Sequence, residues 1–104
     1  MPPKLPPGTR FEVPTGKTST HKYVAHVPSG HTTIHVRFGS KDYEQYKDSV
    51  PPSMGGGEWS FMDHGDEGRR ERYRKRASGQ RCKNGRRCID NVYSPAWFSY
   101  HFLW

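Results

Sequence analysis

Apolar and polar residues alternate most regularly over residues 32–38, where every second position from Ile34 onward is apolar. A weaker alternation covers residues 21–27, because Val24 falls among the polar positions of that stretch. Alternation of this kind is typical of a strand with one face on a core and the other in water. The two stretches flank the turn-forming sequence Pro-Ser-Gly-His at 28–31 and together predict an antiparallel β-hairpin.

The order of charged residues predicts one helix from Asp66 to Ala77. Asp63 or Asp66 can supply the N-cap, acidic residues occupy the first turn, and Arg and Lys fill the last turns before Gly79. This is the order of charges that the helix dipole favours. A second helix is expected after Ser94, since a proline suits the first helical turn and aromatic residues recur behind it.

Residues 1–20 carry five prolines, which hold the backbone extended and exclude a helix. We therefore expect an extended Pro-rich N-terminal arm at 1–20 and a single small domain at 21–104. Two glycine-bearing stretches, 48–61 and 79–90, are predicted to be loop insertions in that domain, and residues 51–57 within the first are expected to form a flexible loop. The predicted fold class is α+β, a small antiparallel hairpin or sheet covered by the basic helix and the C-terminal aromatic helix.

The core has to be built mainly from aromatic rings, because the 104 residues include 14 Phe, Trp and Tyr but only 10 Leu, Ile and Val. Leu, Ile, Val and Phe together stay below the roughly one fifth of a chain that a self-sufficient core needs. Large rings either close a core or dock into a partner, and both interpretations stay open for those of the two helices. These residues are Tyr73, Trp97, Phe98, Phe102 and Trp104.

Positive charge is concentrated at residues 69–87, which hold ten of the 17 Lys and Arg and a single acid. On a helix, Arg69, Arg72 and Arg76 share one face. Like charges at this spacing cost stability unless a partner neutralises them, so an anionic partner is predicted, although many charge runs are only solvated faces. No base-reading motif is visible, so recognition of a particular nucleotide sequence is not expected. The predicted anion-binding residues are Arg69, Arg70, Arg72, Arg74, Lys75, Arg76, Arg81, Lys83, Arg86 and Arg87.

Cys82 and Cys88 enclose five residues around an Asn-Gly turn, so a disulfide across a hairpin is geometrically possible. The chain starts without the apolar stretch of a secretory signal peptide, which argues for intracellular synthesis and makes free thiols the default expectation. No metal site is predicted, because two thiols need further ligands, such as His64 or His101, to hold a zinc ion.

No pattern of catalytic residues accompanies these features. His26 and His35 lie on the paired strands and are expected to form a polar sheet face, and the glycines lack the context of a phosphate-binding loop. We therefore expect no enzymatic activity, no cofactor and no small-molecule substrate. No apolar run approaches the roughly 20 residues of a membrane span, so none is expected.

Four sequence features follow one another over residues 20–104. They are the hairpin Tyr23 to Phe38, the pairs Phe38-Gly39 and Asp42-Tyr43, the helix pattern His64-x-Asp66-x-x-Arg69-x-x-x-Tyr73-x-x-Arg76, and the ending Ser94-Pro95-Ala96-Trp97-Phe98-Ser99 to Leu103-Trp104. In this combination the chain resembles a family of small basic proteins from large double-stranded DNA viruses of algae and protists. Residues 48–61 and the loop with two cysteines depart from the pattern of that family.

The resemblance implies a viral setting and no particular activity. In that setting we expect a minor capsid protein that cements major capsid subunits, located in the virion capsid after synthesis in the host cytoplasm. The arm and the aromatic end would fill grooves between capsid proteins, and the basic helix would meet acidic capsid surfaces or the genome. The alternative is a nonspecific DNA-binding protein associated with the viral genome.

Overall fold

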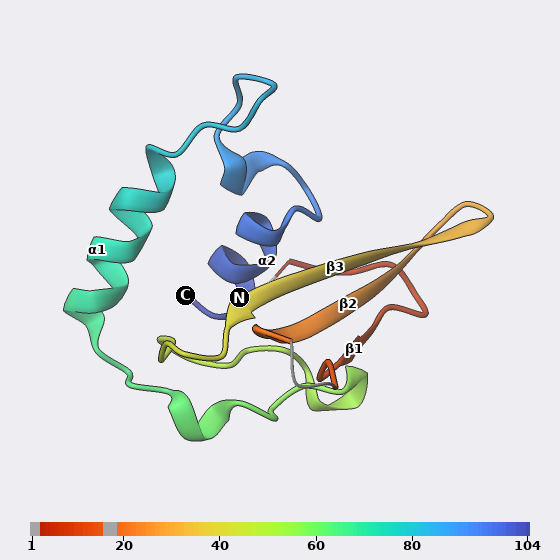
Figure 1. Cartoon of the computed structure of the whole chain (residues 1–104), viewed down its shortest axis with the longest axis horizontal. Coiled ribbons are helices and arrows are strands. Elements are labelled where there is room, and N and C mark those ends of the chain that lie inside the picture. The colour runs from red at the N-terminus through yellow and green to blue at the C-terminus, as the bar shows by residue number, and fades with distance from the viewer. Residues whose placement is uncertain (1–2, 16–18) are drawn as a thin grey trace.

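The computed structural model describes residues 3–15 and 19–104, which form a three-stranded antiparallel sheet and two α-helices (Figure 1). The predicted α+β class is therefore confirmed. The strands lie in the order β1-β2-β3, and both helices follow the sheet in the chain. The elements are β1 at Arg10–Glu12, β2 at His21–Ser29, β3 at Thr32–Ser40, α1 at Glu67–Ser78 and α2 at Pro95–Phe102.

β2 and β3 form the predicted hairpin, with a tighter turn than the sequence indicates. Ser29 pairs with Thr32, so only Gly30 and His31 lie between the strands, and Pro28, which was expected in the turn, belongs to β2. Gly30 has a φ of +62°, in the left-handed region that glycine adopts without steric cost. This conformation lets the chain reverse its direction within two residues.

β1 lies within the Pro-rich arm, so part of that arm belongs to the fold rather than extending away from it. Phe11 pairs with Ala25 of β2 and keeps only 5% of its surface exposed, and Leu5 is buried as well. The Phe11 ring lies edge-on or tilted to four other core rings, at centroid distances of 5.6–6.1 Å. A single apolar residue between Arg10 and Glu12 is too short a pattern to predict a strand, and only pairing with β2 reveals it.

α2 covers one face of the sheet with aromatic rings. Trp97, Phe98 and Phe102 are buried, and Phe98 stacks on Phe38 of β3 with 5.1 Å between the ring centroids. Rings of this size bury on the order of 150–250 Å² each, which makes up for the scarcity of aliphatic residues. For these three residues, the structure therefore favours a place in the core over docking into a partner. Trp104 is half-buried and packs against the core at its edge.

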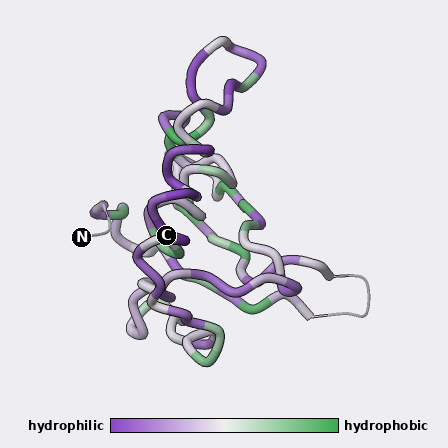
Figure 2. The backbone as a smooth tube through the Cα atoms, turned by 90° about the vertical axis from the view of Figure 1, so that its left-hand side faces the viewer, coloured by the Kyte–Doolittle hydropathy of each residue, from purple (hydrophilic) through white to green (hydrophobic). Residues whose placement is uncertain are grey.

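α1 stands beside α2 instead of lying directly on the sheet (Figure 1). It packs against α2 and against a short 3₁₀ turn at Cys88–Asp90, and Ala77 is the only buried residue of this fully described helix. Figure 2 shows the coil of α1 as strongly hydrophilic. α2 thus provides the cover that was expected from both helices, because α1 has no apolar stripe that could lie against a sheet.

Residues 48–61 are packed into the fold, although a flexible loop is predicted at residues 51–57 of this segment. The segment contains the 3₁₀ turn Pro52–Met54, and its Val50 side chain belongs to the core. A Cβ atom on Gly56 would lie 2.0 Å from the carbonyl oxygen of Val50, so the two backbone stretches approach too closely for any side chain. Glycine is used here for close packing and not for flexibility.

Asp48 organises this segment from the inside. Its carboxylate accepts hydrogen bonds from the Tyr23 hydroxyl at 2.5 Å and from the backbone N–H groups of Val50 and Trp59 at 3.1 and 3.0 Å. Burial and the hydrogen bond to Asp48 raise the pKa of Tyr23 above its ordinary value. A buried carboxylate needs such partners, so the network ties the segment to β2.

Candidate anion-binding cleft

α1 begins and ends within one residue of its predicted bounds. Oδ1 of Asp66 accepts hydrogen bonds from the backbone N–H groups of Gly68 at 2.9 Å and Arg69 at 3.2 Å. These bonds hold the pKa of Asp66 below its ordinary value. Asp63, the other predicted cap, instead accepts a hydrogen bond from the side-chain amide of Gln45. The Asp66 cap therefore determines where along the chain the arginine-rich turns start.

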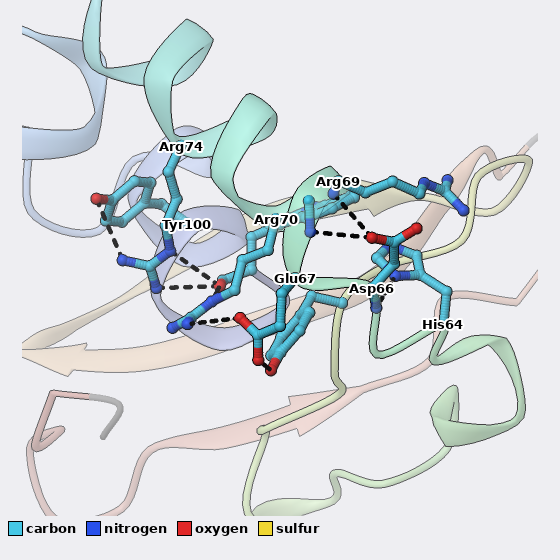
Figure 3. A network of polar contacts seen from close by, with 10 residues as sticks. His64, Asp66, Glu67, Arg69, Arg70, Arg74 and Tyr100 are labelled. Carbon is cyan, nitrogen blue, oxygen red and sulfur yellow. Dashed lines mark hydrogen bonds and ion pairs between the residues drawn. The ribbon is translucent and has the colours of Figure 1, made fainter.

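Arg70 and Arg74 hold α1 against Trp104, beyond the end of α2, and Figure 3 shows the Arg74 side chain beside Tyr100. Arg70 donates from Nε to the backbone oxygen of Trp104 at 2.9 Å, and Arg74 donates to the same oxygen from Nε and Nη2 at 3.1 and 3.0 Å. The Arg74 guanidinium also lies 4.5 Å from the ring centroid of Tyr100. These two predicted anion-binding residues therefore have structural contacts within the protein.

Arg69, Arg72 and Arg76 lie on another face of α1 and line a cleft of about 710 Å³. The prediction that these three residues share one helix face is confirmed. The remaining walls come from β2, β3, the segment after β3, and α2. Among the lining residues, His21, Lys22 and Arg37 come from the sheet and have basic or titratable side chains. Tyr43, which follows β3, adds an aromatic ring.

Three arginines of the cleft are available to a ligand. Within residues 3–15 and 19–104, Arg37, Arg72 and Arg76 make no side-chain hydrogen bond and no ion pair, and all three are exposed. The Arg76 guanidinium lies 5.8 Å from the ring centroid of Tyr73, a cation–π arrangement that leaves its N–H groups free to donate. Because a guanidinium presents its donors as a planar fork, each of these residues can bind a phosphate or carboxylate with two hydrogen bonds.

Glu44 is the one acidic residue among the described residues that line the cleft. It pairs with Arg69 at 3.0 Å, so these two charges neutralise each other. Lys22 is buried, and its ammonium donates a hydrogen bond to the backbone carbonyl of Tyr43. Burial lowers the pKa of Lys22, and the charge of Asp48 opposes that shift. The remaining charge of the cleft is positive, which favours an anionic ligand.

Cys82 and Cys88 form a disulfide bond, so the expectation of free thiols is wrong and the alternative of a disulfide holds. The predicted turn explains the pairing, because Gly85 donates from its N–H to the carbonyl of Cys82 at 2.9 Å and reverses the chain. The two Cα atoms come to lie 5.1 Å apart, within the range that a disulfide requires.

The basic residues of the disulfide loop lie beyond the C-terminal end of α1 (Figure 1) and do not line the cleft. Arg87 pairs with Asp90 at 2.8 Å. Four further predicted anion-binding residues lie outside the cleft and are exposed, namely Lys75 on α1 and Arg81, Lys83 and Arg86 in or beside the loop closed by Cys82 and Cys88. The predicted basic segment is therefore divided into a cleft face, a face that holds α1 in place, and an exposed loop.

Sequence reasoning missed Arg37 and Tyr43 as parts of the site. Arg37 is a polar position in the alternation of β3, and Tyr43 lies in a short polar segment, so neither has a local signal of binding. They lie close to α1 only because the chain after residues 48–61 places this helix beside β3 and the segment that follows it.

Among residues 3–15 and 19–104, no three side chains of His, Cys, Asp or Glu gather as a metal site would require. No helix in this described part of the chain combines the length and apolarity needed to cross a bilayer. No family model, curated protein or solved structure matches the chain significantly. The resemblance to a viral protein family therefore stays a prediction.

Proposed function

We propose that this protein is a non-enzymatic binding protein that attaches to the phosphate backbone of nucleic acid without reading its sequence. The observation that carries the proposal is that Arg37, Arg72 and Arg76, from a strand and a helix, line one cleft and form no ion pair among the described residues. Asp66 is the acidic neighbour of Arg72, whose charge helps to lower the pKa of that carboxylate. Unpaired like charges repel one another, and a polyanion relieves that repulsion. In the viral setting that the resemblance implies, the partner is the genome.

Phosphate binding without sequence readout follows from the type of residue in the cleft. Lys and Arg contacts to phosphates release condensed counterions and supply most of nonspecific affinity. Such contacts position a protein on a nucleic acid but carry no sequence information. The exposed residues of the disulfide loop, Lys83 and Arg86, extend the same positive charge past the end of α1.

A minor capsid protein that cements major capsid subunits is the second candidate. It is supported by Phe61, which leaves 77% of its surface exposed and which a protein partner would cover. Two other features on which that hypothesis depends are used inside the fold, since β1 takes up part of the arm and α2 buries its rings in the core. For this reason we place nucleic-acid binding first.

The test is the salt dependence of binding to DNA of random sequence. Replacing Arg69, Arg72 and Arg76 together by Gln is expected to lower the affinity and the steepness of its fall with salt, by about 0.9 in logarithmic slope for each lost phosphate contact. The control variant exchanges Lys4, Arg10 and Lys47 for Gln, which removes the same charge from exposed positions away from the cleft. Circular dichroism should show α1 intact in both variants.

Two outcomes would contradict the proposal. Negligible DNA binding even at low salt would exclude it. An equal loss of affinity in the cleft variant and the control variant would show that only overall charge matters. If DNA binding is absent while the cleft variant fails to enter capsids, the minor capsid candidate takes its place.

A further inference from the structure

We propose that the cleft between α1, β3 and α2 holds a short segment of single-stranded nucleic acid, with phosphates on Arg37, Arg72 and Arg76 and a base stacked on Tyr43. This inference rests on the proposed function and makes it more specific, because the same arginines could also meet a duplex. It is carried by the size of the cleft, the origin of its arginines and the exposure of Tyr43.

The size of the cleft favours a single strand. Its volume of about 710 Å³ falls within the range of roughly 300–1,000 Å³ that is typical of sites for small ligands. A segment of one or two nucleotides can enter such a space. A duplex keeps its bases stacked inside a stiff rod, so it could lie across the outside of α1 but could not insert between α1 and β3.

The arginines of the cleft come from separate elements. Arg72 and Arg76 are one helical turn apart on α1, whereas Arg37 projects from β3. A flexible strand that runs between these elements can place successive phosphates against donors on both sides. Glu44, the acidic residue of the described lining, is already paired with Arg69 and leaves this path positive.

Tyr43 has the properties of a stacking platform. Its side chain leaves 71% of its surface exposed, which is unusual for a large ring in a protein whose core is short of apolar residues. Its backbone is held in place, because the carbonyl accepts a hydrogen bond from the buried Lys22 ammonium and the N–H donates to the Ser40 carbonyl at 3.4 Å. Exposed aromatic rings beside a positive groove are the usual means by which proteins hold single strands without sequence preference.

An acidic peptide is the competing occupant. β3 is an edge strand of the described sheet, so an extended peptide could pair with its free edge while its carboxylates meet the arginines. Such a peptide would not need Tyr43, because main-chain pairing and charge would supply the affinity. The nature of the occupant is therefore decided by the dependence of binding on the Tyr43 ring.

The experiment compares three fluorescein-labelled probes by anisotropy, using the full chain with its disulfide intact. They are a dT oligonucleotide of about ten nucleotides, within the site sizes known for single-strand binders, a hairpin duplex with the same number of phosphates, and a glutamate-rich peptide. We expect the dT probe to bind most tightly. Tyr43→Ala should weaken its binding about tenfold, the effect of one lost base stack, and leave duplex binding unchanged.

Matched variants separate stacking from charge and from loss of structure. Tyr43→Phe keeps the ring and should bind dT like the unmodified protein. Phe61→Ala removes a ring of similar exposure outside the cleft and should have no effect. Arg37→Gln should lower the logarithmic salt slope for the dT probe by about 0.7, the value for one phosphate contact on a single strand.

The outcomes distinguish this inference from the proposed function. Equal affinity for dT and duplex, with no effect of Tyr43→Ala, would overturn the single-strand site and leave nonspecific nucleic-acid binding standing. Failure to bind either nucleic acid would exclude both. Tighter binding of the glutamate-rich peptide than of dT would assign the cleft to a protein partner and overturn the inference.

Discussion

The Tyr73 ring lies parallel to the Trp104 indole, with 4.4 Å between the ring centroids and 12° between the ring planes. This stack joins the middle of α1 to the chain beyond α2, where Arg74 also donates to the Trp104 backbone oxygen. Because Ala77 is the only buried residue of the fully described α1, the helix is attached mainly by one aromatic pair and a few polar bonds. Elements with so little buried apolar surface open at lower cost than the core.

Replacing Tyr73 by Ala is therefore expected to detach α1 without unfolding the sheet. The loss of a half-buried stacked ring should lower the free energy of unfolding by about 2 kcal/mol. Hydrogen exchange should show faster exchange at residues 67–78, with β2 and β3 still protected. Tyr73→Phe keeps the stack and should behave like the unmodified protein. Equal loss of protection in helix and sheet would contradict a local attachment.

Replacing Trp97 by Ala should destabilise the whole fold. Trp97 is 7% exposed and contacts the rings of Tyr93, Phe98 and Phe102, so its loss should cost about 3 kcal/mol or more. This is a large part of the stability of a domain of this size. Urea unfolding followed by fluorescence or circular dichroism measures the change. Phe61→Ala is the matched control, since that ring is 77% exposed and its removal should have little effect.

Reduction of the disulfide between Cys82 and Cys88 is expected to lower stability without abolishing the fold. Opening a loop this short removes about 2 kcal/mol of chain-entropy stabilisation, which corresponds to a fall in Tm on the order of 10 °C. Calorimetry with and without a thiol reductant measures the shift. The double variant Cys82→Ser/Cys88→Ser should have the lower Tm in both conditions. A response of the double variant to reductant would show that the effect does not come from this bond.

Stability should also fall as the pH drops below about 6.5. Nδ1 of His26 lies 2.8 Å from Nδ1 of His35, and Glu12 and Arg10 of β1 face the same ring. Burial, followed by the charge of Arg10, lowers the pKa of His26 below its ordinary value of 6.5, although Glu12 opposes the shift. The unfolded chain therefore binds a proton at a higher pH than the folded protein does. The contribution of His26 to stability is complete above its pKa in the unfolded chain. It is lost as the pH falls through the pKa of His26 in the folded protein.

Urea unfolding at about pH 7.5 and about pH 5.5 tests this dependence. His26→Gln should reduce the difference between the free energies of unfolding at these two pH values, since Gln does not titrate. His101 contributes in the same direction, because burial and the charge of Arg74 lower its pKa. His31→Gln, at an exposed turn position, is the control for the loss of a histidine and should leave the stability at about pH 7.5 unchanged. The idea fails if the unmodified protein is equally stable at both pH values.

The local elements of this protein are encoded in short stretches of its sequence. Alternation over residues 32–38 predicted β3, the Asp66 cap and the order of charges predicted α1, and the Asn-Gly turn predicted the loop that the two cysteines close. These elements depend on interactions between residues close in the chain, such as capping, pleating and turn formation. The helix face shared by Arg69, Arg72 and Arg76 follows from helical geometry alone, and the structure places all three at one cleft.

What these elements pack against depends instead on contacts between residues far apart in the chain. Nothing local to Phe11 marks it as part of a strand, because the strand exists only when β2 lies beside it. In the same way, Arg70 and Arg74 carry the same charge as Arg72 and Arg76, yet the first pair meets the Trp104 carbonyl and the second pair meets an open cleft. Whether a side chain belongs to the site depends on which distant segment of the chain lies next to it. Packing of the aromatic core brings that segment into place, and the local sequence contains no sign of it.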